Sequence, residues 1–210
     1  AKLCQDFPGE YWRDLEKQPP SGSYPTAFIE ALTAAGYLAA LIPEEYGGAG
    51  LPVRGGAVIL ETINATGCSA SPGHAQMYTM GTILRHGSKE QKEYYLPKIA
   101  SGELRLQAFG VTEPTSGTDT TALRTVAVRD GDDYVVNGQK IWTSTAQQAD
   151  MMFCLVRTEP DAPKHRGISY LLFPMDTPGI EVRPLKTMTG HAEFNEVFFS
   201  DVRVPQSSMV

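Results

Sequence analysis

The stretch RTVAVRDGDDYVVNGQKIW, residues 124–142, determines the fold class of the second half of this chain. Apolar and polar residues alternate from Arg124 to Val128 and again from Tyr134 to Val136, as they do in strands with one buried face. Asp130-Gly131-Asp132 and Asn137-Gly138 interrupt the alternation with residues that are typical of tight turns. The stretch therefore predicts a β-meander that turns twice.

The residues after this stretch continue the pattern of short strands. Segments of strand length, separated by Gly, Pro and Asp, cover residues 151–157, 168–173, 180–184 and 196–204. Strands of this length and spacing favour a small β-barrel or sandwich. We therefore expect a β domain over residues 106–210.

The first half of the chain has the period of helices. Apolar side chains recur on one face from Thr26 to Ala35, and similar amphipathic stretches cover residues 55–66 and 77–86. Ser88 followed by Gln91 is a capping-box arrangement, which predicts a further helix start. Helices first and strands second indicate an α+β fold with a helical domain over residues 1–105, rather than alternating βαβ units.

Composition and charge exclude several classes of protein. The net charge of −6 disfavours a surface for nucleic acid or an anionic membrane. No apolar run approaches the ~20 residues that a membrane-spanning helix requires. Neither the scattered histidines nor the three cysteines have metal-ligand spacing, so we predict no metal site and reduced cysteines.

These cysteines and the absence of a secretory signal predict an intracellular protein, located in the cytoplasm or, in a eukaryote, in the mitochondrial matrix. The chain begins at Ala1 rather than Met, so a targeting segment that precedes it stays open.

The loop between the two halves, Phe109 to Asp119, is the first candidate binding segment. It contains several hydroxyl residues, two carboxylates and the glycines Gly110 and Gly117. Such a loop offers backbone N–H groups and short hydroxyls, which suit the polar edge of a planar cofactor or a phosphate. An interdomain loop with Asx and ST turns would explain the same composition equally well.

The second candidate segment ends in Trp142, Thr143 and Ser144. An indole at a strand end can lie against a flat aromatic ligand while the two hydroxyls donate to its heteroatoms. A core tryptophan that closes the barrel is the alternative interpretation. Gly48-Ala49-Gly50 is not a dinucleotide fingerprint, because Val53 stands where that motif requires glycine.

Taken together, these segments resemble the acyl-CoA dehydrogenase family. Val111-Thr112-Glu113-Pro114 with Gly117-Thr118-Asp119 is similar to that family's flavin loop, usually written T-E-P-x-x-G-S-D. Asn137-Gly138-x-Lys140-x-Trp142 followed by Ser144 resembles its second flavin segment. Other segments resemble the family in the same order along almost the whole chain: residues 42–48, 87–91, 167–173, 176–179 and 201–205.

The resemblance implies that the chain binds FAD with an N-terminal helical bundle and a small β-barrel or sandwich. Phe109, Val111 and Thr112 are expected to edge the flavin ring, although some members have tyrosine in place of Phe109. Thr118 stands at the usual serine position near the cofactor pyrophosphate and the CoA arm. It is therefore expected to bind both cofactor and substrate.

The resemblance also implies roles for the second segment. Trp142 is expected to pack against the flavin, with Thr143 and Ser144 near its reactive N5 edge. The implied reaction is the α,β-dehydrogenation of an acyl-CoA thioester, in which a carboxylate removes the α proton while the β hydrogen leaves as hydride to N5.

The family supplies its catalytic base, a glutamate, from a C-terminal helical domain that is absent from this chain. Glu113 is rejected as the base because its motif position is structural, so no residue here is predicted to be catalytic. We expect the chain alone to be inactive and to hold FAD weakly or not at all. We attribute its end at Val210 to truncation or disorder of the remainder, with a base from another polypeptide as the alternative.

The resemblance implies an acyl-CoA substrate, an electron-transfer flavoprotein as electron acceptor, and a homodimer or homotetramer. Acyl-CoA oxidases and flavin monooxygenases share the scaffold and stay open as alternatives. A non-catalytic partner subunit of a heteromeric dehydrogenase is a third alternative. A two-domain binding module without flavin would leave the paired segments unexplained, and the acyl chain length stays open.

Overall fold

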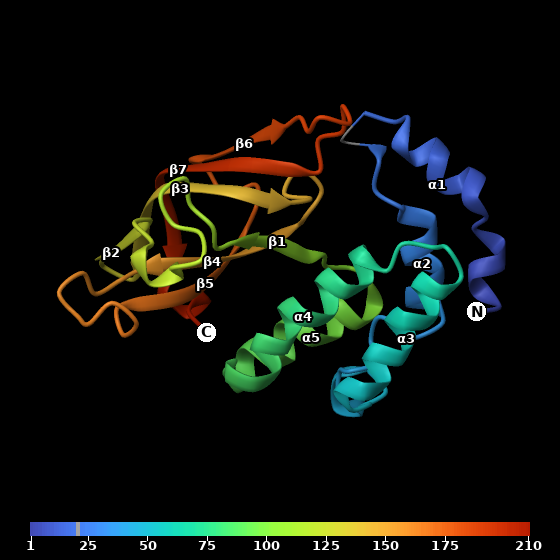
Figure 1. The fold of residues 1–210 in the computed structure, drawn as a ribbon. Coiled ribbons are helices and arrows are strands. Elements are labelled where there is room, and N and C mark those ends of the chain that lie inside the picture. The colour runs from blue at the N-terminus through green and yellow to red at the C-terminus, as the bar shows by residue number, and fades with distance from the viewer. Residues whose placement is uncertain (20–21) are drawn as a thin grey trace. The chain divides into compact units, whose positions relative to one another are not determined.

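The computed structural model describes residues 1–19 and 22–210 (Figure 1). The chain divides into two compact units, Ala1–Leu106 and Gln107–Val210. The first unit is helical, and the second is built from a β-sheet. The predicted α+β class, with helices and strands segregated along the chain, is confirmed.

The helical unit contains α1 (Gly9–Glu16), α2 (Thr26–Ala34), α3 (Val53–Ala65), α4 (Ser71–His86) and α5 (Lys89–Ser101). Phe28 on α2 is completely buried and meets the rings of Phe7 and Trp12 edge to face, with ring centroids 5.1 Å apart in both pairs. Aromatic pairs prefer this geometry. The N-terminal segment is thereby packed onto the core that α2 and α3 form.

Two helix starts show how local residues determine boundaries. The predicted capping box is confirmed, since the Gln91 N–H donates to Ser88 Oγ at 3.2 Å and the Ser88 N–H donates to Gln91 Oε1 at 3.0 Å. Helix α4 begins at Ser71, before the amphipathic stretch that was predicted from residue 77. Pro72 is compatible with the first helical turn because the N–H it lacks would have no intrahelical partner there.

The β unit forms one seven-stranded sheet (Figure 1). The strand order is β1-β4-β2-β3-β7-β6, and β5 pairs with β4. Strand β2 runs parallel to β4, while the β2–β3, β3–β7, β4–β5 and β6–β7 pairs are antiparallel. The strands are Leu106–Gly110, Val126–Asp130, Asp133–Ser144, Met151–Arg157, Ile168–Pro174, Ile180–Leu185 and Phe194–Pro205, numbered β1 to β7 in that order.

Two details of the β half differ from the sequence prediction. The predicted turn at Asn137-Gly138 is wrong, because β3 runs without a break from Asp133 to Ser144. Gly138 instead marks a β-bulge, where the register with β7 shifts. Its φ is +151°, and a Cβ there would lie 2.6–2.8 Å from atoms of Thr125, so only glycine fits. Strand β1 was not predicted at all.

Candidate functional site

The two candidate segments lie side by side within the β unit. The backbone N–H of Ile141 on β3 donates to the carbonyl oxygen of Thr112 in the loop at 2.9 Å. The loop is closed on itself by a pair of backbone hydrogen bonds between Glu113 and Ser116, of 2.9 and 3.1 Å. The structure therefore brings Val111 and Thr112 next to the end of β3 that carries Trp142.

A buried ion pair lies beneath this contact. Lys140 Nζ is 2.8 Å from Glu113 Oε1, and the side chains of Lys140 and Glu113 are 0% and 3% exposed. The same ammonium donates to the Val111 carbonyl at 3.3 Å. The backbone N–H groups of Arg124 and Thr125 donate to the Glu113 carboxylate at 2.6 and 2.9 Å. The pair thus joins the loop, β3 and the start of β2.

This environment determines the charge state of Glu113. Burial alone would raise the pKa of the carboxyl group, but hydrogen bonds from Lys140, Thr125 and the Arg124 backbone outweigh it and hold the pKa below its ordinary value. A carboxylate that is stabilised in its charged form and closed off from solvent is a poor proton acceptor. The geometry therefore gives a physical reason against Glu113 as a general base.

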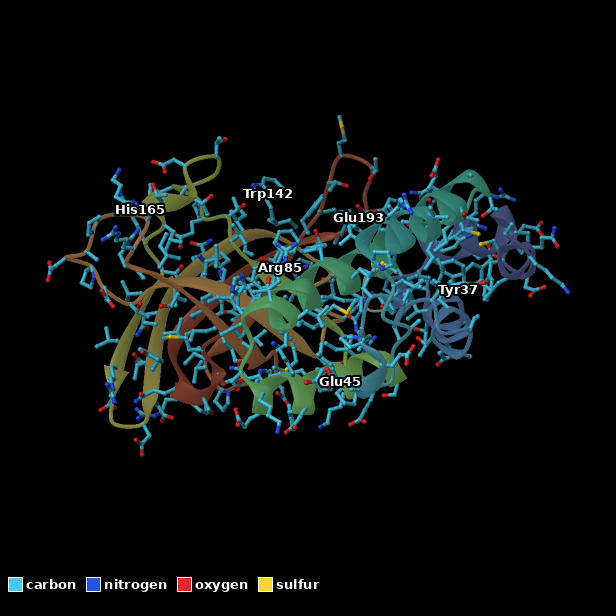
Figure 2. The ribbon with its side chains drawn as sticks, turned by 90° about the horizontal axis from the view of Figure 1, so that it is seen from below. Tyr37, Glu45, Arg85, Trp142, His165 and Glu193 are labelled. Atoms are coloured by element: carbon cyan, nitrogen blue, oxygen red, sulfur yellow. The ribbon has the colours of Figure 1, made fainter. Side chains whose placement is uncertain are left out.

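Trp142 is presented to solvent by a second irregularity in β3. The register with β7 shifts between Lys140 and Thr143, and Trp142 has a φ of +60°, which is rare outside glycine. Its side chain is 53% exposed and projects from the β unit (Figure 2). The indole meets Phe194 edge to face at 5.8 Å. A core tryptophan that closes the barrel is excluded.

Thr143 and Ser144 continue the strand beside this exposed indole. Thr143 is completely buried, and its Oγ1 has no hydrogen-bond partner within residues 1–19 and 22–210. Ser144 is partly buried. An unpaired buried hydroxyl is costly unless something else satisfies it. A planar ligand fits against the accessible indole, whereas the Thr143 hydroxyl is closed off from solvent.

Phe109 and Thr118 are placed differently from the other predicted residues. Phe109 lies on β1, partly buried, and its ring stacks on Phe153 of β4 at 5.9 Å. Thr118 is exposed in the loop, next to Asp119, whose backbone carbonyl accepts a hydrogen bond from Ser116 Oγ at 2.7 Å. No contact joins Thr118 to the Trp142 end of β3 in the described chain. The cofactor and substrate roles of all these residues stay predictions.

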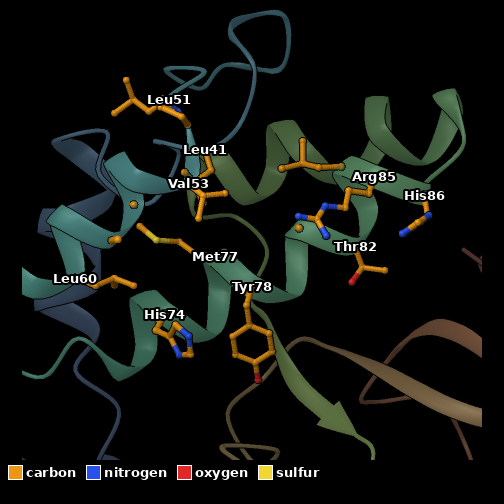
Figure 3. Close-up of a pocket in the computed structure, with 15 residues that line it drawn as sticks. Leu41, Leu51, Val53, Leu60, His74, Met77, Tyr78, Thr82, Arg85 and His86 are labelled. Atoms are coloured by element: carbon orange, nitrogen blue, oxygen red, sulfur yellow. The ribbon is translucent and has the colours of Figure 1, made fainter.

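The helical unit carries a separate cleft of about 580 Å³ between α3 and α4 (Figure 3). Val53, Gly56 and Leu60 line it from α3, and Met77 and Gly81 from α4. Polar groups also line it along α4, namely His74, Tyr78, Thr82, Arg85 and His86.

Two properties of this cleft suit a mostly apolar ligand that carries a hydrogen-bonding group. Partial desolvation raises the pKa of the Tyr78 hydroxyl to about 12 although the residue is 37% exposed, so the hydroxyl stays protonated and can donate a hydrogen bond. The volume of the cleft lies in the range of about 300–1,000 Å³ that is typical of small-molecule sites. From the sequence, residues 74–81 resemble the wall of the family's acyl pocket, but no residue there was assigned a role.

Within the described residues, no group of three or more His, Cys, Asp or Glu side chains could hold a metal ion. The three cysteines are buried and not joined in disulfides. No helix of the described chain is long and apolar enough to cross a membrane.

Comparison with known proteins matches both halves of the chain to domains of one family. Residues 5–103 match the acyl-CoA dehydrogenase N-terminal domain, and residues 108–202 match the acyl-CoA dehydrogenase middle domain. Acyl-CoA dehydrogenase FadE26 of Mycobacterium tuberculosis is 43% identical over 178 residues, which cover 83% of this chain and 44% of the relative.

Solved structures agree with this assignment. The Tcur3481-Tcur3483 steroid ACAD has a TM-score of 0.89 and 36% identity, and the match covers 100% of this chain and 54% of that one. The ChsE4-ChsE5 complex from Mycobacterium tuberculosis has a TM-score of 0.81 and 38% identity, covering 100% and 55%. The chain thus spans about half the length of these proteins. It belongs to the acyl-CoA dehydrogenase family, whose N-terminal and middle domains it contains.

Proposed function

We propose that this chain forms the helical and β portions of an FAD-dependent enzyme that dehydrogenates an acyl-CoA thioester between its α and β carbons. The observation that carries the proposal is the backbone hydrogen bond between Thr112 and Ile141. This hydrogen bond joins the segment that resembles the family's flavin loop, residues 111–119, to the strand end that presents Trp142. FAD would supply the hydride acceptor in this reaction.

The chain's own residues would bind and orient FAD and the substrate rather than remove the α proton. Trp142 offers an exposed aromatic face, and the partly exposed Ser144 offers a hydroxyl to a ring heteroatom. Thr118, exposed in the loop, is free to meet a phosphate of the cofactor or of CoA. A base must come from elsewhere, since Glu113 is closed within its ion pair. We therefore expect no turnover from these residues alone.

The cleft between α3 and α4 is our candidate for the acyl group. Its apolar lining suits a hydrocarbon, and small residues such as Gly56, Ala57 and Gly81 leave room for a bulky one. The steroid ACAD that resembles this chain is one reason to include steroid-derived acyl-CoAs among the substrates tested. We further propose an electron-transfer flavoprotein as electron acceptor and a dimeric or tetrameric assembly.

A visible spectrum of the purified protein, in its longest native form, tests the proposal. We expect flavin absorption bands that bleach on addition of a suitable acyl-CoA, without release of peroxide. Trp142→Ala should weaken FAD binding by about tenfold or more, since base–aromatic stacking of this kind contributes about 1–3 kcal/mol. Val128→Ala, which shortens another exposed apolar residue of the β unit, should leave FAD binding unchanged.

The acyl cleft is tested with Gly81→Leu. A Cβ at Gly81 meets nothing within 4 Å, so the leucine side chain can enter the cleft without displacing the fold. KM should rise for a steroid-derived or long-chain acyl-CoA and change little for a short-chain one. Val58→Leu on the exposed face of α3, outside this cleft, is the matched control. Equal effects of both variants on all substrates would contradict the assignment.

A second candidate function is that of a subunit in a two-component dehydrogenase. The observation that favours it is the ChsE4-ChsE5 complex, a solved heteromeric assembly that this chain resembles over its whole length. Native mass spectrometry of the protein alone and with a second acyl-CoA dehydrogenase-like chain distinguishes the two. Retention of FAD and turnover by the protein alone would exclude the second candidate.

A further inference from the structure

The buried pair of Lys140 and Glu113 is positioned between two irregular segments rather than within a regular one. Lys140 is the last residue of β3 paired with β7, opposite Val197, before the register shifts at Trp142. Glu113 lies in the turn of the loop that begins after β1. The pair therefore joins this loop to one of the two places where the register of β3 with β7 shifts.

Burying two charges is unfavourable for stability unless their geometry repays the loss of hydration. Here two of the three N–H groups of the ammonium donate, and the carboxylate accepts three hydrogen bonds. Lys140 Nζ donates to Glu113 Oε1 at 2.8 Å and to the Val111 carbonyl at 3.3 Å. The carboxylate also accepts the backbone N–H groups of residues 124 and 125. A pair of apolar side chains could fill the same volume, but it could not bind the loop, β3 and the start of β2 together.

The surroundings of the pair are neutral and tightly packed on the side of β1 and β4. Cys154 lies close enough to interact with both charges, but burial raises the pKa of its thiol to about 12, so the thiol stays neutral. A Cβ on Gly110, the last residue of β1, would lie 3.2 Å from Lys140 Cγ and 3.0 Å from Cys154 Sγ. The stem of Lys140 is thus packed tightly against the strand from which the loop emerges.

We propose that Lys140 and Glu113 are positioning residues for the flavin ring, an inference that rests on the proposed function. The ammonium fixes the Val111 carbonyl and the carboxylate fixes the loop. Together they maintain the hydrogen bond from Ile141 to Thr112 and hold the strand bulge that presents Trp142. Neither residue touches the ring or the reacting carbons, and both act through Thr112 and Trp142.

The first test measures the strand–loop contact without any cofactor. In Lys140→Met, deuterium uptake by peptides that contain Ile141 should accelerate about tenfold or more, the factor expected for losing hydrogen bonds that involve a charged group. Uptake in β5, away from the pair, should change less. Arg203→Met is the matched control, because it breaks an exposed ion pair of the same unit with Asp130 and Asp133, each at 3.0 Å. It should leave the Ile141 peptides unchanged.

The second test separates positioning from stability. Glu113→Gln combined with Lys140→Met removes both charges but keeps an acceptor for the backbone N–H groups of residues 124 and 125. The double variant should recover much of the resistance to unfolding lost in Lys140→Met, yet FAD should still dissociate about tenfold more readily than from the wild type, because the Val111 carbonyl has lost its donor. Recovery of FAD affinity together with stability would reduce the pair to a structural role and overturn the inference.

The inference and the proposed function can be contradicted independently of each other. Absence of FAD binding by the wild-type protein would overturn the proposed function. Unchanged uptake at Ile141 in Lys140→Met would overturn the inference whether or not FAD binds.

Discussion

The two units of the chain place their charges in opposite ways. In the helical unit the buried polar side chains that the structure describes, Gln76, Thr79 and Gln91, are uncharged, and groups such as Arg85 and His86 stay exposed at the cleft. In the part of the chain that the structure describes, the charged side chains that are buried are Glu113 and Lys140, both in the β unit. Apolar packing is tolerant of small shifts, whereas a buried ion pair requires one geometry. We therefore expect the β unit to hold bound groups in one fixed position and the helical unit to accept ligands of different shapes.

The largest expected effect comes from breaking that buried pair. Lys140→Met would leave the Glu113 carboxylate buried without its counter-charge, which typically costs about 3–5 kcal/mol of folding free energy. Urea unfolding should be followed by Trp142 fluorescence in a Trp12→Phe background, because the chain has two tryptophans and Trp12 belongs to the helical unit. Arg203→Met should unfold at nearly the wild-type urea concentration. Similar losses from both variants would end the distinction between the two kinds of ion pair.

The next largest effect is expected at Gly138, where the first bulge of β3 lies. Gly138→Ala would place a methyl group against Thr125 at a φ of +151°, so strain and overpacking together should cost about 2–4 kcal/mol. Gly131→Ala also acts at a positive φ, +61°, but its Cβ would meet nothing within 4 Å. It should lose less, about 1–2 kcal/mol, from backbone conformation alone. Equal losses would show that contact with Thr125 is unimportant.

These two glycines also mark the limit of prediction from sequence. Gly131 lies in a hairpin turn whose signal is local, and the bounds of β4, Met151–Arg157, were likewise predicted as the structure has them. Gly138 follows Asn137, an equally local turn signal, but it serves a bulge because Thr125 and β7 decide its conformation. Contacts from distant residues override a local turn preference in such cases.

The candidate site shows the same division. The two segments were recognised from their residues, but the Thr112–Ile141 hydrogen bond that joins them is a tertiary contact. The Glu113–Lys140 pair was not predicted, because Lys140 stands between Gln139 and Ile141 and nothing local shows that its side chain is buried. For the cleft of the helical unit, residues 74–81 resembled the wall of an acyl pocket, but its lining depends on how α3 and α4 are packed.

Lowering the pH should destabilise the β unit by protonating Glu113. The expected loss of stability is smaller than that caused by Lys140→Met. The pKa of this carboxyl group is depressed in the folded state, so its contribution to stability is complete above its unfolded value, about 4.3, and is lost as the pH falls through the folded value. The stability difference between wild type and Glu113→Gln should therefore be constant near neutral pH and shrink below about pH 4. Urea midpoints from pH 7 to 3 measure it, and parallel curves would contradict the depressed pKa.

The smallest effect is expected in the helical unit. Single interactions contribute little there, because none of its described charged side chains is buried. Ser88→Ala removes the capping box of α5 and should cost about 1 kcal/mol, the usual contribution of an N-cap hydroxyl. Ser71→Ala is the control, since Ser71 begins α4 but no side-chain cap bond is made there. Circular dichroism melting of both variants gives the difference. If Ser88→Ala destabilised the chain as much as Lys140→Met, local capping and buried charge would carry equal weight, and the contrast between the two units would not hold.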